Sequence, residues 1–577
     1  MNLKKITYLI GLAMLTITIF ANFAICAPCT TCTEIDINTT SCTTIICGKD
    51  ATIDGSVITS HTNDCGHCDP RIAYVPAQDY EPGAERAVYE FILDYPRYCS
   101  YDRGPTYYPK AGEEIMEPIG YIPQVEHTYA YFDGVYGMMN EHQLAIGETT
   151  CSAKTYAAPI PNGEALFDIA ELSKVALERC TTAREAIKLM GDLGEEYGYY
   201  GWGETLTIVD SKEAWVFSML ATPDGKSAIW AAQRVPDDEI AVLANQFTIR
   251  EIDLDNPDYF MASENIFEIS ETEGWWDTEE PFDFCAVCGS GEYSHPYYSL
   301  RRKWRAYDLL APSKEFSPWV EDDFTKEYPF SIKPDKKVSM QDVMAITRDY
   351  YQGTEFDLTK GLAAGPFGNP NRYESGVGEE LVKGAWERAI GIFRSDYVQI
   401  IQTRDWLPSA IGGVMWYTPD VATTSCFIPI YAGSTELPEA YTIGTRSEYN
   451  EDSAYWVFNF VSNWADLKFS YMIDDIKEKY EELENKMFAF QPAIDQAASL
   501  LYEKNPELAS EYLTEYCVNN GNSVVNEWRE FGQYLVMKYI DGYVNEPEVG
   551  EGIGYPAEWL KEVGYDEGPT SYEKPGN

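Results

Sequence analysis

One cysteine, Cys42, stands at the start of a stretch that combines a thiol with a histidine and a carboxylate. Residues 42–47 and 56–62 are rich in β-branched side chains, and a glycine-containing turn separates the two runs. This pattern predicts a β-hairpin, which brings the start of the first strand close to the end of the second. We therefore expect Cys42 to lie near three polar residues at the end of the second strand: His61, Asn63 and Asp64. A thiol in such surroundings is a candidate nucleophile, and a buried core thiol or a disulfide with Cys47 is the alternative.

Four other cysteines form two pairs with CxxC spacing, Cys65/Cys68 and Cys285/Cys288. Four thiolates from two such pairs can hold a zinc ion in a tetrahedral site. Disulfides within or between the pairs are the alternative, and we favour them because other features of the chain indicate export. The sequence therefore predicts neither a metal ion nor another cofactor.

Residues 1–27 have the layout of a signal peptide. Two lysines precede an apolar run over 6–24, and small residues follow around Ala27. The run is nearly long enough to span a bilayer, so an uncleaved anchor helix is the alternative. We favour cleavage, and we interpret residues 28–41, which are rich in Thr and Cys, as a propeptide-like spacer. The sequence thus predicts a protein that is secreted, or held at the cell surface or in a periplasm.

The net charge argues against two classes of partner. The chain has 43 Lys and Arg residues against 93 Asp and Glu residues, which gives a formal net charge of −50. Because such a surface repels nucleic acid and anionic membranes, we predict no nucleic-acid partner and no stable membrane partner. The acidic residues are dispersed, which is typical of a solvated surface. Aromatic residues make up 14% of the chain, which favours sheet-rich packing.

The order of the predicted elements indicates a fold of the α+β class. Blocks of hairpin-linked strands alternate with helices, which favours stacked layers of antiparallel sheet and helix over a parallel βαβ arrangement. Helical spacing predicts one helix within 165–193. Residues 464–545 form a predicted helical extension, and 546–577 form an irregular tail rich in Pro and Gly. Three strands are predicted before the extension: 389–394, 397–402 and 411–417.

The chain has only five histidines, which are few for a hydrolase built on a Cys–His pair. A cysteine can instead be activated by a free α-amine, which titrates near ~8 and belongs to the same residue as the thiol. This chemistry requires Cys42 to be the first residue of the mature chain. Attack of the Cys42 thiol on the Ser41 carbonyl would make that cut. Ser41 and Cys42 are therefore the predicted processing site.

Several blocks of the sequence resemble one enzyme family. CTTIICGKDATIDGS at 42–56, followed by SHTND at 60–64, resembles the start of the cysteine dipeptidases (dipeptidase A-like) of the N-terminal-nucleophile hydrolase superfamily. More distant relatives of that family include penicillin V acylase and bile salt hydrolase. The resemblance implies an αββα sandwich over 42–463, with the nucleophile at a strand start. Further blocks keep the family's order: 137–149, 241–246, 299–312, 386–408 and 411–433.

The resemblance also implies a role for each matching residue. Cys42 matches the nucleophile, and its freed amine matches the general base. Asp64 matches the acid that contacts this amine, and Asn245 matches an amide that supports the oxyanion. Arg388 matches a late active-site arginine, with Arg394 as the rival position.

Three more positions fall in the pocket that the resemblance implies. Asn140 and Thr150 lie around a second donor position, where the distant acylases use an asparagine. His61 stands where those acylases carry an arginine, whose fixed charge lowers the pKa of the thiol. Because a histidine can do this only when it is protonated, we expect activity to fall more steeply with pH than in an arginine-bearing relative. An unchanged pH profile in a His61→Arg variant would count against that hypothesis.

Each assignment has a structural alternative. Asn245 and Asp64 also fit turn positions, and Arg388 also fits a surface pair with Glu387. The activity that the resemblance implies is hydrolysis of the single peptide bond of small peptides through an S-acyl-enzyme. An acylase for a non-peptide amide, or a non-catalytic surface-binding protein that kept the fold, are the alternatives. Assembly into a homo-oligomer is left open.

Overall fold

The computed structural model describes residues 40–373, 386–545, 550 and 552–565. The predicted signal peptide, the predicted spacer up to residue 39 and most of the predicted tail lie outside the described residues. None of the helices in the described part has an apolar run of the length that a membrane span needs.

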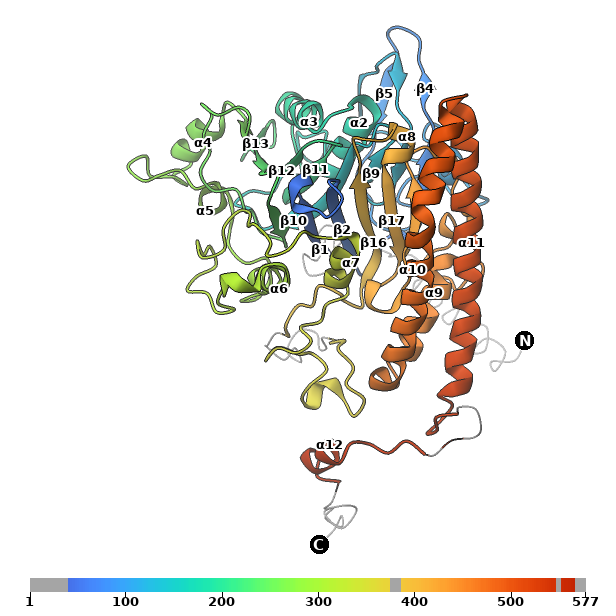
Figure 1. The fold of residues 1–577 in the computed structure, drawn as a ribbon. Coiled ribbons are helices and arrows are strands. Elements are labelled where there is room, and N and C mark those ends of the chain that lie inside the picture. Colours follow the sequence, from blue (N-terminus) through green and yellow to red (C-terminus); the bar gives the residue numbers. More distant parts are fainter. Residues whose placement is uncertain (1–39, 374–385, 546–549, 551, 566–577) are drawn as a thin grey trace, which may run out of the picture. The chain divides into compact units, whose positions relative to one another are not determined.

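Among the described residues, the first large sheet is antiparallel and has the strand order β14-β1-β2-β16-β17-β18 (Figure 1). The predicted hairpin is confirmed as β1 and β2, and further strands flank it on both sides. The start of β1, which carries Cys42, pairs with β2, and its second half, Thr44–Cys47, also pairs with β14. The strands are β1 (Thr40–Cys47), β2 (Val57–Cys65), β14 (Ile240–Leu243), β16 (Ser395–Thr403), β17 (Val414–Pro419) and β18 (Ile428–Tyr431).

The second large sheet is also antiparallel and has the order β15-β13-β12-β11-β10-β9-β8-β3. Its strands are β3 (Ala73–Val75), β8 (Tyr131–Asp133), β9 (Gly137–Asn140), β10 (Ala145–Cys151), β11 (Gly203–Val209), β12 (Ala214–Ala221), β13 (Ala228–Val235) and β15 (Phe260–Ala262). Two short ribbons pair β4 (Gln78–Asp79) with β7 (His127–Thr128) and β5 (Glu85–Val88) with β6 (Gly120–Pro123).

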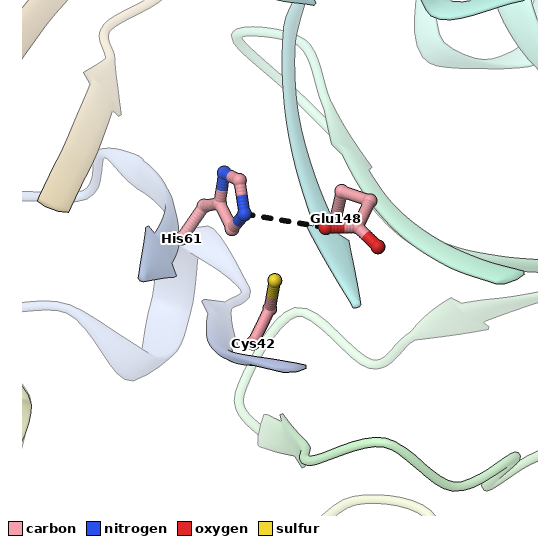
Figure 2. Close-up of side chains that lie close together, drawn as sticks. All are labelled: Cys42, His61 and Glu148. Atoms are coloured by element: carbon pink, nitrogen blue, oxygen red, sulfur yellow. Dashed lines mark ion pairs between the residues drawn. The ribbon is translucent and has the colours of Figure 1, made fainter. Parts of the chain in front are cut away.

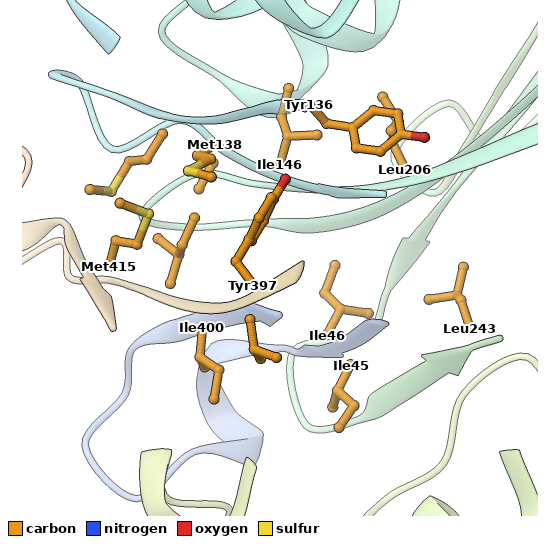
Figure 3. Packing of buried hydrophobic residues seen from close by; sticks show 14 of the residues in the cluster. Ile45, Ile46, Tyr136, Met138, Ile146, Leu206, Leu243, Tyr397, Ile400 and Met415 are labelled. Carbon is orange, nitrogen blue, oxygen red and sulfur yellow. The ribbon is translucent and has the colours of Figure 1, made fainter. Parts of the chain in front are cut away.

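The two large sheets pack against each other through β1 and β2 on one side and β10 and β11 on the other. A Cβ on Gly147 would lie 2.5 Å from the carbonyl oxygen of Ser60, so only glycine lets β10 approach β2 this closely. The Thr59 and Thr207 hydroxyls meet at 2.6 Å across the same interface. Figure 3 shows buried apolar side chains of both sheets in one cluster, among them Ile46, Ile146, Leu206 and Ile400.

Helices pack on both large sheets, so that sheet layers lie between helix layers. Helices α2 and α3 pack on the second sheet, whereas α6, α7, α9, α10 and α11 pack on strands of the first sheet. The mixed, antiparallel α+β class predicted from the sequence is confirmed. The helices are α2 (Ile169–Arg179), α3 (Ala183–Tyr197), α4 (Ile266–Thr272), α5 (Phe284–Cys288), α6 (Leu300–Leu310), α7 (Met340–Thr347), α8 (Ser409–Gly412), α9 (Ala454–Ala465), α10 (Phe469–Tyr502), α11 (Pro506–Lys538) and α12 (Ala557–Glu562).

The predicted helical region near the C-terminus is confirmed as α9, α10 and α11 (Figure 1). Two acidic residues of α10 form buried or half-buried ion pairs with the sheet region, Glu484 with Arg348 at 2.6 Å and Asp495 with Arg404 at 2.5 Å. These helices are thereby fixed to the first sheet. The predicted boundary at residue 464 falls inside α9.

Two predicted elements are wrong in detail. The single helix predicted within 165–193 is two helices, because the side chain of Thr182 caps α3 in a capping box with Glu185. The predicted strand 389–394 is a loop that leads into β16. Its Gly391 N–H donates to the Asp349 carbonyl at 2.9 Å instead of to a neighbouring strand. A Cβ on Gly391 would meet the Thr423 hydroxyl, so this loop is packed closely against its neighbours.

Candidate active site around Cys42

The register of the hairpin places the predicted residues together. Ser41 lies opposite Asp64 and Cys42 lies opposite Asn63 in the pairing of β1 with β2. Cys42 is a free thiol that is 2% exposed, so the disulfide with Cys47, which was the alternative to a nucleophile, does not form. The peptide bond between Ser41 and Cys42 thus lies at the start of a central strand, beside an acidic residue.

An imidazole and a carboxylate lie next to the Cys42 thiol (Figure 2). The Cys42 sulfur and ligand atoms of His61 and Glu148 lie within 4.8 Å of one another, and His61 Nε2 is 3.3 Å from Glu148 Oε2. The His61 ring is held edge-on between the rings of Tyr136 and Tyr397, with centroids 5.6 and 5.7 Å away. In the described part of the chain, this is the one cluster of at least three His, Cys, Asp or Glu side chains with metal-ligand spacing.

A second buried carboxyl group, Glu204, completes the cluster. Burial alone would raise the pKa of Glu148, but hydrogen bonds from His61 and Glu204 and the charge of His61 hold it below its usual range. Burial and the negative charge of Glu148 raise the pKa of Glu204 well above its usual range. Of the two carboxyl groups, Glu148 is therefore the one whose surroundings favour the charged form, and Glu204 is the one whose surroundings favour the neutral form.

The surroundings of the Cys42 thiol disfavour its charged form. Burial, the charges of Glu148 and Asp64 and a hydrogen bond to Glu148 raise the pKa of the thiol well above its usual value. The arrangement fits a proton-transfer cluster, in which a carboxylate accepts a hydrogen bond from the nucleophile's own proton.

Asp64 is fixed on the backbone side of Cys42. Its carboxylate forms a buried ion pair with Arg388 and accepts hydrogen bonds from Thr62 Oγ1, at 2.8 Å, and from Ser395 Oγ. Arg388 also donates to Ser41 Oγ at 3.0 Å and lies 3.4 Å from the Ser41 carbonyl oxygen. The alternative for Arg388, a surface pair with Glu387, does not form: Arg388 pairs with Asp64, and Glu387 pairs with Arg301.

Arg302 of α6 binds the carbonyl of the nucleophile itself. Its guanidinium donates to the Cys42 carbonyl at 2.9 Å and to Asn245 Oδ1 at 2.6 Å. Thr149 Oγ1 donates to the same Cys42 carbonyl at 3.2 Å. Asn245 has a φ of 60°, and its side-chain NH2 donates to the Thr150 carbonyl at 2.7 Å. Asn245 and Thr150 are therefore part of the site, although the amide of Asn245 is bound to protein groups here.

Asn140 is not brought to this cluster. Its amide donates to the carbonyls of Leu177 and Cys180, both at 2.9 Å, and accepts from the N–H groups of His142 and Leu144, both at 3.0 Å. All four hydrogen-bonding positions of the amide are thus used by the backbone. Asn140 ties the turn after β9 to the end of α2, which corrects its predicted place in the substrate pocket.

The zinc site considered for the two CxxC pairs does not form. Cys65 and Cys68 are joined in a disulfide, as the favoured alternative predicted for that pair. Cys285 and Cys288 are free, buried thiols of α5. The disulfide removes two of the four thiolates that the zinc site would need.

Three residues in and around the site come from elements that no sequence motif linked to Cys42. Glu148 comes from β10, Glu204 from β11 and Arg302 from α6. Glu148 and Arg302 lie inside blocks that carry the family resemblance, and that was a usable signal. Glu204 lies outside those blocks, and only the pairing of Glu204 with Thr150 across β10 and β11 reveals it.

Comparison with known proteins agrees with this geometry. The profile of peptidase family C69 matches residues 41–482, so the match begins one residue before the thiol and spans most of the chain. The chain belongs to peptidase family C69. It is therefore a peptidase, and the predicted family membership is confirmed.

Curated relatives of this C69 peptidase carry consistent names. A probable dipeptidase of Latilactobacillus sakei is 26% identical over 82% of this chain and 93% of its own length. Probable dipeptidase B of Lactococcus lactis is 26% identical over 82% of this chain and 94% of its own length. Dipeptidase A of Lactobacillus helveticus is 23% identical over 77% of this chain and 85% of its own length.

Proposed function

We propose that this C69 peptidase is an exported, cysteine-type dipeptidase with an N-terminal-nucleophile fold and mechanism. It hydrolyses the single peptide bond of a dipeptide through an S-acyl-enzyme on Cys42. The observation that carries this proposal is the position of Cys42, near the start of β1, with the Asp64–Arg388 pair beside the preceding residue, Ser41. The names of the relatives supply the substrate class.

The first step of the proposal is self-cleavage at Ser41. Before cleavage the nitrogen of Cys42 is an amide and cannot act as a base, so the thiol proton passes to the Glu148 carboxylate. The sulfur then bonds to the Ser41 carbonyl carbon, the Ser41–Cys42 bond breaks, and the departing nitrogen takes that proton to become an amine. Water hydrolyses the resulting thioester, which releases Ser41 with a new carboxylate and restores the thiol.

Turnover then uses the amine that self-cleavage has freed. The α-amine of Cys42 takes the thiol proton, and the thiolate attacks the carbonyl carbon of the dipeptide. The peptide bond breaks as the leaving amine takes the proton from the α-ammonium group. The amine next takes a proton from water, whose hydroxide hydrolyses the thioester and regenerates the thiol.

The fixed charges around Cys42 support these roles. Asp64, whose carboxylate is held by Arg388, lies opposite Ser41 in the pairing of β1 with β2, and from there it would orient the new α-ammonium group. Arg302 already donates to a carbonyl of this strand, so it adds positive charge near the position where an oxyanion develops. The apolar run at 6–24 supports export, because a Sec-type signal would carry the chain out of the cell.

The test is a substrate panel on the purified protein and on a Cys42→Ala variant. The panel contains dipeptides, tripeptides and N-acyl amides, and release of free amine is measured. Cys47→Ala is the matched control, because Cys47 is a buried, free thiol of the same strand. We expect dipeptides to be hydrolysed fastest, with activity lost in Cys42→Ala and kept in Cys47→Ala.

Two results would contradict the proposal. Full dipeptide hydrolysis by Cys42→Ala would exclude the thiol as the nucleophile. Turnover of N-acyl amides without turnover of dipeptides would show an acylase instead.

A further inference from the structure

A buried asparagine beside the nucleophile has an amide donor without an acceptor. Asn63 of β2 lies directly opposite Cys42 in the pairing of β1 with β2, and it is 2% exposed. Within the described part of the chain, no group accepts a hydrogen bond from its side-chain nitrogen, Nδ2. Because an unpaired polar group is costly to bury, most such groups in folded proteins have a partner. An unpaired donor at this place therefore indicates an acceptor that comes from outside the chain.

The Asn63 side chain lies on the same face of the first sheet as the Cys42 thiol. Directly opposite residues of an antiparallel pair share a face, and their Cβ atoms are about 4.5–5.5 Å apart. His61, two residues before Asn63 on β2, lies on that face too, and its ring belongs to the cluster with the Cys42 sulfur. This face packs against β10, whose Glu148 reaches the same cluster. The Asn63 amide can therefore reach the space beside the sulfur.

The two other asparagines that the sequence analysis considered are bound to protein groups. Asn245 Nδ2 donates to the Thr150 carbonyl at 2.7 Å. Asn140 Nδ2 donates to two backbone carbonyls near the end of α2, both at 2.9 Å. Of these three asparagines, only Asn63 has an NH2 group that can bind a substrate oxygen without first breaking a hydrogen bond to the protein. A donor that needs no rearrangement is the kind that stabilises a developing oxyanion best.

We infer that Asn63 is an oxyanion donor, whose Nδ2 hydrogen-bonds the oxygen of the carbonyl group that the Cys42 sulfur attacks. In each tetrahedral intermediate the carbonyl carbon is bonded to the sulfur, so its oxygen lies close to a side chain directly opposite Cys42. The hydrogen bond strengthens as negative charge develops on that oxygen. This inference rests on the proposed function, because it adds a catalytic residue to the same reaction.

Asn63→Leu is the first test, because leucine has nearly the same shape as asparagine and no donor. Dipeptide hydrolysis is measured per mature chain, with the chains that begin at Cys42 counted by mass spectrometry. We expect kcat to fall about 100- to 1,000-fold, the size seen for removal of one oxyanion donor, while KM changes by less than about 3-fold. Asn63→Gln keeps an amide and should recover part of the loss.

The stability of the same variant separates catalysis from a structural role. The urea midpoint of Asn63→Leu should equal or exceed that of the wild type, because the substitution removes a buried amide that has no partner. Asn140→Leu is the matched control, since Asn140 is also buried but its amide is fully hydrogen-bonded. It should show the reverse pattern, with a lower urea midpoint and kcat close to that of the wild type.

A substrate analogue tests which atom receives the hydrogen bond. In a dipeptide thioamide, sulfur replaces the oxygen of the peptide carbonyl and is a weaker hydrogen-bond acceptor. The ratio of kcat/KM for the normal dipeptide to that for the thioamide should be smaller in Asn63→Leu than in the wild type. An equal ratio in the two proteins would show that Asn63 does not bind this oxygen.

The outcomes separate this inference from the proposed function. If the wild type hydrolyses dipeptides and Asn63→Leu has the same kcat, the oxyanion role is overturned while the dipeptidase proposal stands. A raised KM at unchanged kcat, or a clearly lower urea midpoint, would also overturn it. If the wild type hydrolyses no dipeptide, the proposed function fails, and the release of Ser41, followed by intact mass, decides instead. That release passes through the same kind of intermediate, so an equal rate in Asn63→Leu and the wild type would overturn the inference.

Discussion

The two sides of Cys42 carry opposite charge. On the backbone side, the Ser41–Cys42 peptide lies among guanidinium groups, with Arg388 and Arg394 on Ser41 and Arg302 on the Cys42 carbonyl. On the thiol side, the sulfur lies beside the buried Glu148 carboxylate, whose negative charge raises the pKa of the thiol. The same charge raises the pKa of the buried Glu204 carboxyl group.

This difference matches what each side must do in acyl transfer. Negative charge develops on the carbonyl that is attacked, and fixed cations stabilise it without rearrangement. The thiol must lose a proton, and a carboxylate held in its charged form can receive that proton. The cations and the carboxyl groups come from different elements, so each side can be altered separately.

The largest loss of activity is expected on substitution of Cys42 itself, which lies between the two sides. Cys42→Ala removes the nucleophile, so both self-cleavage and turnover should fall by about 1,000-fold or more. Cys42→Ser should keep some self-cleavage and lose most turnover, since a hydroxyl is a poorer nucleophile with an amine base. Intact mass and dipeptide hydrolysis measure the two effects, and normal turnover in Cys42→Ala would contradict a thioester route.

Substitutions on the backbone side of Cys42 are expected to lower the free energy of unfolding more than substitutions on the thiol side. Asp64→Asn leaves the buried Arg388 guanidinium without its ion pair, which should lower the free energy of unfolding by about 3–5 kcal/mol. The double variant Asp64→Asn/Arg388→Gln should lose less than the sum of the single variants, because neither partner is left as an unpaired charge. Denaturant unfolding of the three variants measures this coupling, and strictly additive losses would show that the pair does not interact.

The carboxyl groups on the thiol side are expected to affect how the free energy of unfolding depends on pH. The pKa of Glu204 is raised in the folded protein, so above about pH 4.3, its unfolded value, the folded state holds a proton that the unfolded state has lost. This contribution is complete below that pH and is lost as pH rises through the raised pKa. In Glu204→Gln a neutral hydrogen-bond donor replaces the carboxyl group. The free energy of unfolding of this variant should therefore fall less than that of the wild type as pH rises above about 4.3.

Urea unfolding over a pH series checks this expectation. Glu279→Gln serves as the control, because Glu279 is an exposed acidic residue and its variant should follow the wild-type curve. Parallel curves for Glu204→Gln and the wild type would show that the pKa of Glu204 is not raised in the folded protein.

The smallest effect on activity is expected at Asn140, which the structure removes from the site. Asn140→Ala leaves backbone groups of the β9 turn and of the end of α2 without partners, at a cost of about 1–3 kcal/mol in unfolding free energy. Its kcat/KM for dipeptides should stay within about 2-fold of the wild type, because a substitution that does not contact the Cys42 site is expected to act independently of it. A large drop in kcat/KM at unchanged stability would return Asn140 to the pocket.

The local part of the site was predictable from the sequence. The β-branched runs around a glycine turn define the hairpin, and its register then brings Cys42 beside Asn63 and Ser41 beside Asp64. The family resemblance located Arg388 and Asn245, which no local pattern could place. The long C-terminal helices followed from their apolar spacing.

What sequence could not supply is contact between distant elements. Glu204 lies near Glu148 only because β11 pairs with β10 in one particular register. The residues of one strand alone do not determine that register. The loop at 389–394 has the apolar composition of a strand, but its backbone bonds to Asp349 and so delivers Arg388 and Arg394 to Ser41. Tertiary contacts overrode local preference there.

The N-terminal residue of the exported, purified protein is the most direct test of the mechanism. Mass spectrometry of the intact chain and of its N-terminal peptide should find Cys42 as residue one, with a free α-amine, in every active preparation. The Cys42→Ala chain should keep Ser41 attached. An active wild-type protein whose chain begins near Ala27 or Pro28, with the Ser41–Cys42 bond intact, would contradict the proposed mechanism.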